Sequence, residues 1–184
     1  MIKTILLAAG YGKRLNTITK KLPKCLVSIN GTPLLEIWLN KLTKEGFGPF
    51  LINTHYKDYL VSEFVNKSKF KNQIKIVYEK NLLGTAGTLI KNIDFFNSND
   101  GLLLHADNYC EENLSNFLQA HQNRPNNCIM TMLTFQTNKP HQSGIVKTNS
   151  EGILKAFYEK KKKSLGNNAN GAIYLLSPGM LNII

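Results

Sequence analysis

Short apolar runs alternate along the first 135 residues with segments in which apolar residues recur every three or four positions. The first pattern predicts buried β-strands and the second predicts amphipathic helices. The strand-like runs cover residues 2–8, 50–54, 74–78, 102–106 and 129–135. Helical segments lie between them, one beginning at Pro33 and ending before Gly46, the others at about 59–65, 86–93 and 112–122.

This succession of strands and helices predicts an α/β fold, a Rossmann-like three-layer sandwich with a mostly parallel central sheet and helices on both faces. After Pro140 the pattern changes to shorter strand-like runs at 144–148, 153–158 and 171–176. They predict a small β region, a second layer or lid, and a last helix begins near Ser177. With no internal repeat or low-complexity linker, residues 1–184 are expected to form a single domain.

Composition narrows the class of protein. Hydrophobic residues make up 42% and charged residues 19% of the chain, which is typical of a globular protein. No run approaches the roughly 20 apolar residues that a membrane span requires, and the apolar run at 5–9 is too short for a signal peptide. We therefore expect a cytoplasmic protein with no membrane partner. Three scattered cysteines favour neither a disulfide framework nor a Cys-x-x-Cys metal site.

The formal net charge of +11 is compatible with an anionic partner, but biased lysine usage could explain part of it, so the charge alone decides nothing. Nucleic acid is one candidate, because lysine and arginine neutralise phosphates. However, the basic residues are dispersed, and the sequence has no zinc-finger spacing, RNP-like aromatic run or Arg-rich helix. A small phosphorylated substrate is the favoured partner, and no nucleic-acid partner is expected.

A glycine pair follows the first predicted strand. Gly10 and Gly12 would let backbone N–H groups approach an anion closely, and Arg14 and Lys24 add positive charge at the same sheet edge. A dinucleotide-binding turn would need a third glycine where Leu15 stands, and no Gly-Lys-Ser/Thr of a Walker A loop is present. Taken alone, the pair is more typical of a plain turn after a strand than of an anion site.

The longer pattern resembles the sugar nucleotidyltransferase family. The segments that carry the resemblance are, in order, Leu7-Ala8-Ala9-Gly10-Tyr11-Gly12-Lys13-Arg14-Leu15, Pro23-Lys24-Cys25-Leu26, Leu83-Gly84-Thr85-Ala86-Gly87, His105-Ala106-Asp107, Ser143-Gly144-Ile145-Val146, Phe157-Tyr158-Glu159-Lys160 and Asn170-Gly171-Ala172-Ile173-Tyr174. They cover nearly the whole chain in the order of the family pattern. The resemblance implies the same α/β fold and a nucleotidyl transfer activity.

On the nucleotide side, the resemblance assigns catalytic roles to Arg14, Lys24 and Asp107, and makes Asp107 a ligand of a Mg²⁺ cofactor. It assigns nucleotide binding to residues of the two glycine-rich segments: Leu7, Ala8, Ala9, Gly10, Gly12, Gly84 and Thr85. Without the resemblance, Asp107 is typical of a helix cap or turn after a strand, and Thr85 is typical of a helix N-cap. His105 is expected to be a packed or hydrogen-bonded histidine and not a ligand.

On the acceptor side, the resemblance implies that Gly144, Glu159, Lys160 and Asn170 bind the sugar 1-phosphate. The sequence departs from the family pattern at four places. Lys13 stands in place of a small hydroxyl residue, Ala106 in place of glycine and Lys161 in place of proline, and the small residues of Gly171-Ala172 are transposed.

The resulting hypothesis is transfer of a nucleotidyl group from a nucleoside triphosphate to a sugar 1-phosphate, giving a nucleotide-sugar and pyrophosphate. GTP with mannose 1-phosphate or a heptose 1-phosphate is the first interpretation. UDP-, dTDP- or CDP-sugar synthesis and a non-catalytic regulatory paralogue are the alternatives. Relative to the family pattern the chain is expected to lack a C-terminal strand and helix or more, and with them a second metal-binding Asp. A truncated chain, a fragment, and a minimal variant that uses another carboxylate such as Asp94 or Glu159 are the alternatives. The sequence leaves homo-oligomer formation open.

Overall fold

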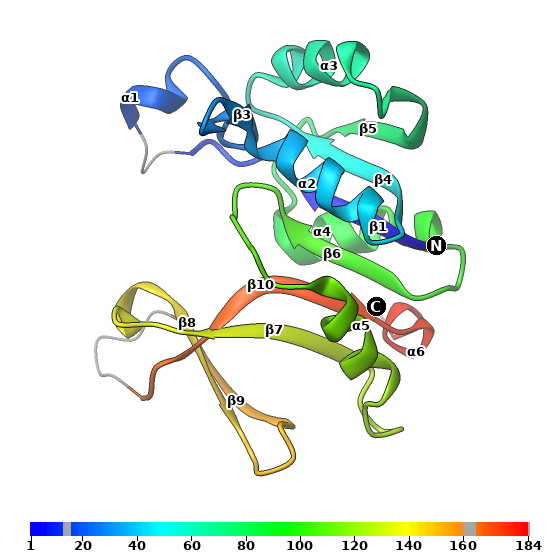
Figure 1. Ribbon diagram of the computed structural model, residues 1–184, viewed down its shortest axis with the longest axis vertical. Helices are drawn as coiled ribbons and strands as arrows, with labels where there is room; N and C mark the ends of the chain where they lie inside the picture. Colours follow the sequence, from blue (N-terminus) through cyan, green and yellow to red (C-terminus); the bar gives the residue numbers. More distant parts are fainter. Residues whose placement is uncertain (13–15, 160–164, 184) are drawn as a thin grey trace.

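Four parallel strands form the centre of a larger sheet (Figure 1). They are β1 (Ile2–Leu7), β4 (Phe47–Thr54), β5 (Ile74–Tyr78) and β6 (Gly101–His105), in the order β5-β4-β1-β6. All three neighbouring pairs are parallel. The computed structural model describes residues 1–12, 16–159 and 165–183. The central strands confirm the expected α/β fold, although β4 begins at Phe47, earlier than the apolar run predicted, because buried Phe47 pairs with Ile2.

Helices cover both faces of these strands. One face packs against α2 (Leu34–Lys44), α3 (Asp58–Lys67) and α5 (Leu114–Gln122), and the other against α4 (Gly84–Lys91), the 3₁₀ helix η4 (Ile93–Phe96) and α6 (Pro178–Leu181). Alternate strand residues serve the two cores: Leu6 belongs to the first and Ile5 to the second. This arrangement is the three-layer sandwich that the sequence predicts.

The β region after α5 continues the central sheet and forms no second layer. The strand β10 (Asn168–Leu176) pairs antiparallel with β6, with β7 (Met130–Gln136) and with β8 (Gly144–Thr148), which forms a hairpin with β9 (Leu154–Glu159). Successive residues of β10 pack into opposite cores, Leu175 into one and Leu176 into the other. Because both faces of β10 are apolar there, the strand is buried between helices as part of the main sheet. The prediction of a separate layer was wrong, and the run at 129–135 forms an antiparallel strand.

Short elements complete the described chain. They are α1 (Asn16–Thr19), η2 (Lys24–Leu26), the hairpin of β2 (Ser28–Ile29) and β3 (Thr32–Pro33), η3 (Lys71–Gln73) and η5 (Pro140–Gln142). In the part of the chain that the structure describes, no helix is both long and apolar enough to cross a membrane.

A buried histidine on α5 makes the stability of this fold depend on pH. The His121 side chain is fully buried, its Nδ1 lies 2.8 Å from the Thr131 hydroxyl, and its Nε2 lies 3.7 Å from Asp100. Burial lowers the pKa of His121 and the Arg124 charge lowers it further, whereas Asp100 raises it. The folded protein therefore favours the neutral imidazole more than the unfolded chain does.

We expect the free energy of unfolding to fall as the pH drops from about 7.5 to about 5.5. Below about pH 6.5 the unfolded state binds a proton on His121 that the folded state resists binding, so stability is lost as the pH falls toward the lower folded pKa. Urea unfolding across this range measures the slope. His121→Gln, which keeps a polar partner for Thr131, should flatten it; equal slopes for both proteins would contradict the assignment.

Candidate functional site

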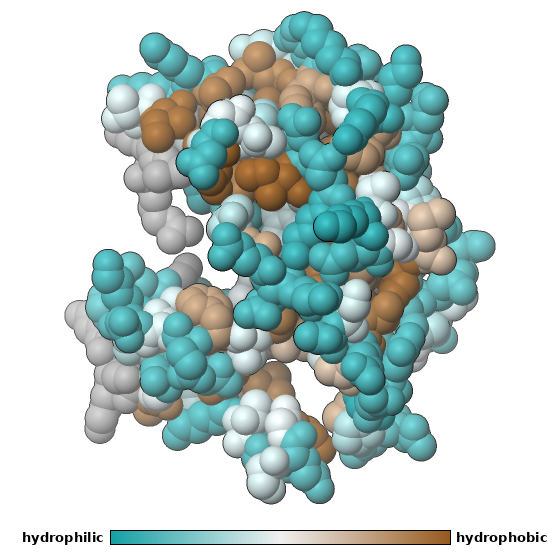
Figure 2. Space-filling view, viewed as in Figure 1, coloured by the Kyte–Doolittle hydropathy of each residue, from teal (hydrophilic) through white to brown (hydrophobic). Residues whose placement is uncertain are grey.

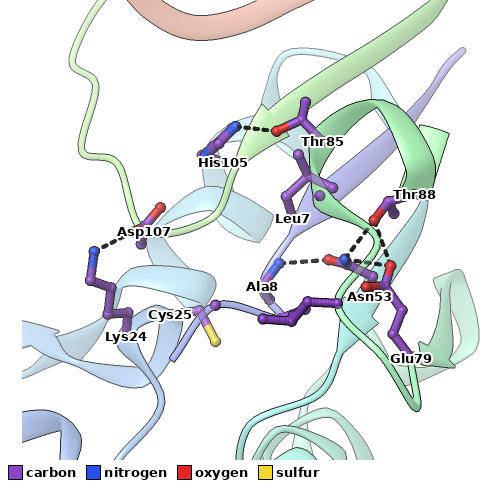
Figure 3. Close-up of a pocket in the computed structure, with 14 residues that line it drawn as sticks. Leu7, Ala8, Lys24, Cys25, Asn53, Glu79, Thr85, Thr88, His105 and Asp107 are labelled. Atoms are coloured by element: carbon purple, nitrogen blue, oxygen red, sulfur yellow. Dashed lines mark hydrogen bonds and ion pairs between the residues drawn. The ribbon is translucent and has the colours of Figure 1, made fainter. Parts of the chain in front are cut away.

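A cavity of about 230 Å³ lies at the carboxyl ends of the parallel strands, where α/β sheets commonly bind ligands (Figure 3). Its lining comes from the ends of β1, β4, β5 and β6, the start of α4 and η2. The lining residues are Leu7, Ala8, Ala9, Gly10, Lys24, Cys25, Asn53, Glu79, Leu82, Gly84, Thr85, Thr88, His105 and Asp107. We call it the donor cavity. It unites residues from segments far apart in the sequence that were expected to bind nucleotide or metal.

Gly12 and Arg14 are not among the residues that line this cavity, for different reasons. Gly12 does not line the donor cavity, although it lies in the same loop. Arg14 lies outside the residues that the structure describes, as does Lys13, so the roles expected of the 13–15 segment stay predictions.

The two loop glycines are needed for different reasons. Gly12 has φ +68°, and a Cβ there would lie 2.6 Å from Thr19 Cγ2 and 2.8 Å from Lys24 Cγ. The Thr19 hydroxyl also donates a hydrogen bond to the Gly12 carbonyl at 3.0 Å. Gly10 has open space on its Cβ side and lines the cavity. Gly12 is therefore required by loop packing, whereas a Cβ at Gly10 would meet no atom within 4 Å.

Alanine at these two positions should separate the two effects. Gly12→Ala is expected to cost about 2 kcal/mol of stability from backbone strain and crowding. Gly10→Ala should leave stability unchanged, because nothing would meet its Cβ. It should raise the KM for the nucleoside triphosphate that the resemblance implies about ten-fold, because a methyl group is added to a residue that lines the cavity. Urea unfolding and initial-rate kinetics measure both. A Gly10→Ala protein as destabilised as Gly12→Ala would count against this division.

An ion pair closes one side of the cavity. Lys24, the first residue of η2, places its Nζ 2.6 Å from Asp107 Oδ2, and the two side chains are 19% and 30% exposed. Asp107 follows β6 directly, beyond the fully buried Ala106, whose N–H donates to the Leu7 carbonyl. The alanine that replaces the family's glycine is thus buried, and a lysine charge and a carboxylate meet in the cavity that Gly10 also lines.

His105 lies at the junction of this cavity and a second one. Its Nε2 is 3.3 Å from the Thr85 hydroxyl, and it lines both cavities. Burial lowers the pKa of His105, as does the Lys24 charge, against the opposing effect of Asp107, so the ring is neutral at pH 7. The expectation of a hydrogen-bonded histidine is confirmed, but its position between the cavities could not be read from the sequence. Thr85 bonds to His105 and does not cap α4, whose N-cap is Leu83.

A buried polar network that the sequence did not reveal forms the wall of the donor cavity. Asn53 at the end of β4, Glu79 just after β5 and Thr88 on α4 are 3%, 1% and 1% exposed. They hydrogen-bond to one another, and Asn53 Oδ1 also accepts the Ala8 N–H at 2.8 Å. The only available signal was that polar residues follow two neighbouring apolar strands.

Cys25 is the thiol nearest this site. It lines the donor cavity and is 1% exposed, and burial raises its pKa to about 12. The thiol therefore stays protonated at neutral pH, which excludes a role for Cys25 as a nucleophile.

A larger cavity of about 850 Å³ opens between β6 and the β7–β10 region, where Figure 2 shows the surface hollowed. We call it the acceptor cavity. Gly144, Glu159 and Asn170, three of the residues expected to bind the acceptor, line it together. A Cβ on Gly144 would lie 2.6 Å from the Phe157 ring and 3.1 Å from Glu159 Oε2, so an alanine here would require the Phe157 ring to shift. Lys160 lies outside the described residues, as does Lys161.

A bulge in β10 shapes the floor of the acceptor cavity. Its register with β7 shifts between Asn170 and Tyr174. The residue in the left-handed region is Ala172, with φ +54°, and Asn170 Oδ1 accepts the Ala172 N–H at 2.8 Å. Gly171 instead faces the Leu133 carbonyl, 3.0 Å from where a Cβ would lie. The transposed small residues thus lie in the bulge, where the Asn170 side chain accepts the N–H of the left-handed Ala172.

Among the described residues, two carboxylates line the donor cavity; Glu79 is buried, whereas the Asp107 side chain is 30% exposed and accessible to a metal ion. In the same part of the chain, no group of three or more His, Cys, Asp or Glu side chains could hold a metal. Asp94 lies in η4 and lines a separate cavity with Leu181, and Glu159 lies in the acceptor cavity. Asp107 fits Mg²⁺, which commonly takes only one or two carboxylates and completes its shell with substrate phosphates and water.

Comparisons with known proteins agree with this fold and arrangement. A family model described as nucleotidyl transferase matches residues 3–184. The mannose-1-phosphate guanyltransferase of Schizosaccharomyces pombe is 27% identical over 100% of this chain and 52% of its own length. The D-glycero-alpha-D-manno-heptose 1-phosphate guanylyltransferase of Campylobacter jejuni is 29% identical over 98% of this chain and 78% of its own.

Solved structures show the same fold. HddC from Yersinia pseudotuberculosis superimposes with a TM-score of 0.82 at 20% identity, covering 100% of this chain and 80% of that one. The chain spans about half the length of the first curated relatives that it matches.

Proposed function

Since the chain belongs to the nucleotidyl transferase family, we propose that it transfers a nucleotidyl group from a nucleoside triphosphate to a sugar 1-phosphate. The observation that carries the proposal is the pair of adjoining cavities. The donor cavity holds a glycine loop, a lysine and a carboxylate, and the acceptor cavity is larger and lined by both polar and apolar residues. His105 borders both cavities. Two substrates bound in this way would meet at the His105 junction.

The chemistry requires charge neutralisation more than proton transfer. An oxygen of the sugar 1-phosphate attacks the α-phosphorus in line, the bond from that phosphorus to the bridging oxygen breaks, and pyrophosphate leaves. A phosphate monoester is already an anionic nucleophile, so no general base is needed. Positioning and electrostatic stabilisation then supply the rate.

The residues divide these tasks. Lys24 would stabilise the negative charge of the triphosphate, and Arg14 of the same loop is proposed to assist it. Gly10 and Gly12 would let the loop follow the phosphates, and Leu7, Ala8 and Ala9 would line that path. Asp107 would hold Mg²⁺, which supplies positive charge to the phosphate oxygens when it is bound.

The base and the acceptor would occupy opposite ends of the combined site. Gly84 and Thr85, at the start of α4, are proposed to face the nucleobase. Glu159 and Asn170 are proposed to hold sugar hydroxyls, and Lys160 the sugar phosphate. GTP with mannose 1-phosphate or a heptose 1-phosphate is the favoured pair, because two of the sequence relatives carry guanylyltransferase names for these sugars.

A pyrophosphate-release screen tests the proposal. GTP, UTP, dTTP and CTP are each combined with a panel of sugar 1-phosphates and Mg²⁺, and we expect release to be fastest with GTP and a manno-configured acceptor. Binding of a nucleotide-sugar without release from any pair would favour the regulatory alternative. Release with UTP, dTTP or CTP but not GTP would retain the activity class and reject the base assignment.

A further inference from the structure

The buried network of Asn53, Glu79 and Thr88 joins the two segments between which a nucleotide would lie (Figure 3). At one end, Asn53 Oδ1 accepts the N–H of Ala8, the first residue after β1, at 2.8 Å. At the other end, Glu79 Oε2 accepts the N–H of Leu83, the residue before the glycine-rich start of α4, at 3.2 Å. The network thus holds one backbone amide of each segment.

Within the network, the side chains of Asn53, Glu79 and Thr88 hydrogen-bond to one another. Glu79 Oε1 accepts from Asn53 Nδ2 at 2.9 Å and from the Thr88 hydroxyl at 2.5 Å, and Asn53 Nδ2 lies 3.1 Å from Thr88 Oγ1. All three side chains are almost fully buried. The Ala8 amide fixes the orientation of the Asn53 amide, because only its oxygen can accept that hydrogen bond.

A buried network of this kind is stiff, because any displacement would leave a polar atom unpaired. Burying these polar groups carries a desolvation penalty, and apolar side chains between β4, β5 and α4 would fill the same space without it. Stability alone therefore does not explain the network. Its ends instead reach backbone amides of the phosphate loop and of the turn before α4. We propose that Asn53, Glu79 and Thr88 are positioning residues that set the spacing between the triphosphate and nucleobase subsites, and so determine nucleotide affinity. This rests on the proposed function.

A reciprocal exchange of the acid and the amide provides the test. Asn53→Asp places two carboxylates, both acceptors, against each other. Glu79→Gln places two N–H donors against each other, at positions 79 and 53. Each single variant therefore loses the hydrogen bond between the two side chains. In the double variant Asn53→Asp/Glu79→Gln, the carboxylate at position 53 accepts hydrogen bonds from the Ala8 N–H and from the side-chain amide at position 79. The oxygen of that amide still accepts the hydrogen bond of the Leu83 N–H. The Thr88 hydroxyl can turn to donate to that carboxylate. The double variant therefore restores a donor for every acceptor and keeps the net charge.

We expect each single variant to raise the dissociation constant for the preferred triphosphate at least about ten-fold, and the double variant to recover to within about three-fold of wild type. The KM for the sugar 1-phosphate should change less than about two-fold. Nucleotide binding is measured by calorimetry without acceptor, and kinetics are measured well below each melting temperature. If a single variant does not fold, Thr88→Val, which removes only the hydroxyl, should still raise the dissociation constant several-fold.

The outcomes separate this inference from the proposed function. Lower melting temperatures with unchanged nucleotide affinity would make the network merely structural and overturn the inference alone. A double variant no better than the worse single variant would also overturn it. If the wild-type chain binds none of the four triphosphates, the proposed function fails and the inference fails with it.

Discussion

Replacing Asp107 with asparagine is expected to lower kcat for pyrophosphate release by about two to three orders of magnitude. Asparagine keeps the volume of the side chain but removes the charge that would hold Mg²⁺ against the phosphates. The Lys24–Asp107 ion pair is also lost. Because this pair is partly exposed, stability should change by less than about 1 kcal/mol, so the loss of rate cannot be attributed to unfolding.

The dependence on Mg²⁺ makes this prediction specific. The Mg²⁺ concentration for half-maximal rate should rise in Asp107→Asn, and high Mg²⁺ should restore part of the activity. Asp94→Asn is the matched control, because Asp94 was the alternative carboxylate and lies in a separate cavity; its rate should equal that of wild type. A near-wild-type rate for Asp107→Asn would reject the assignment of Asp107.

Replacing Lys24 with methionine should lower kcat to a similar extent, about two to three orders of magnitude, for a different reason. Methionine keeps an unbranched side chain beside Gly12 but removes the positive charge that is proposed to neutralise the triphosphate. High Mg²⁺ should not restore the rate. The double variant Lys24→Met/Asp107→Asn should be scarcely worse than the poorer single variant, because residues that act together are not additive.

Lys41→Met is the control for Lys24. The Lys41 side chain is 18% exposed and pairs with Glu45 at 3.0 Å, so it resembles Lys24 in burial and pairing but does not line the donor cavity. Its kcat should be unchanged. Initial rates of pyrophosphate release measure all these variants, and a Lys24→Met enzyme that turns over at the wild-type rate would show that this charge is dispensable.

The central part of the fold was predictable because its signal is local. Leu35, Trp38, Leu39 and Leu42 recur at helical spacing and are all buried on α2, and the short apolar runs became the four parallel strands. The β region was harder to predict. Whether β10 joins the main sheet depends on pairing with β6, which lies much earlier in the chain, and no local pattern encodes that contact.

The candidate site shows the same division. Motif order was enough to predict Lys24, Asp107 and Glu159 as candidates, and the fold places the first two in one cavity and the third in the next. Asn53 and Glu79 were not predicted, because a polar residue after a strand is common and gains meaning only when its partners are known.

By itself, then, the sequence determined the family, the parallel α/β core and the set of residue types available for phosphate chemistry. Only the tertiary structure decided that Lys24 pairs with Asp107, that His105 borders both cavities and that the β region continues the central sheet. The physical reason is the sequence separation over which each kind of interaction acts. Periodicity and glycine turns act over a few residues, whereas a cavity forms where strand ends distant in the sequence meet at one sheet edge.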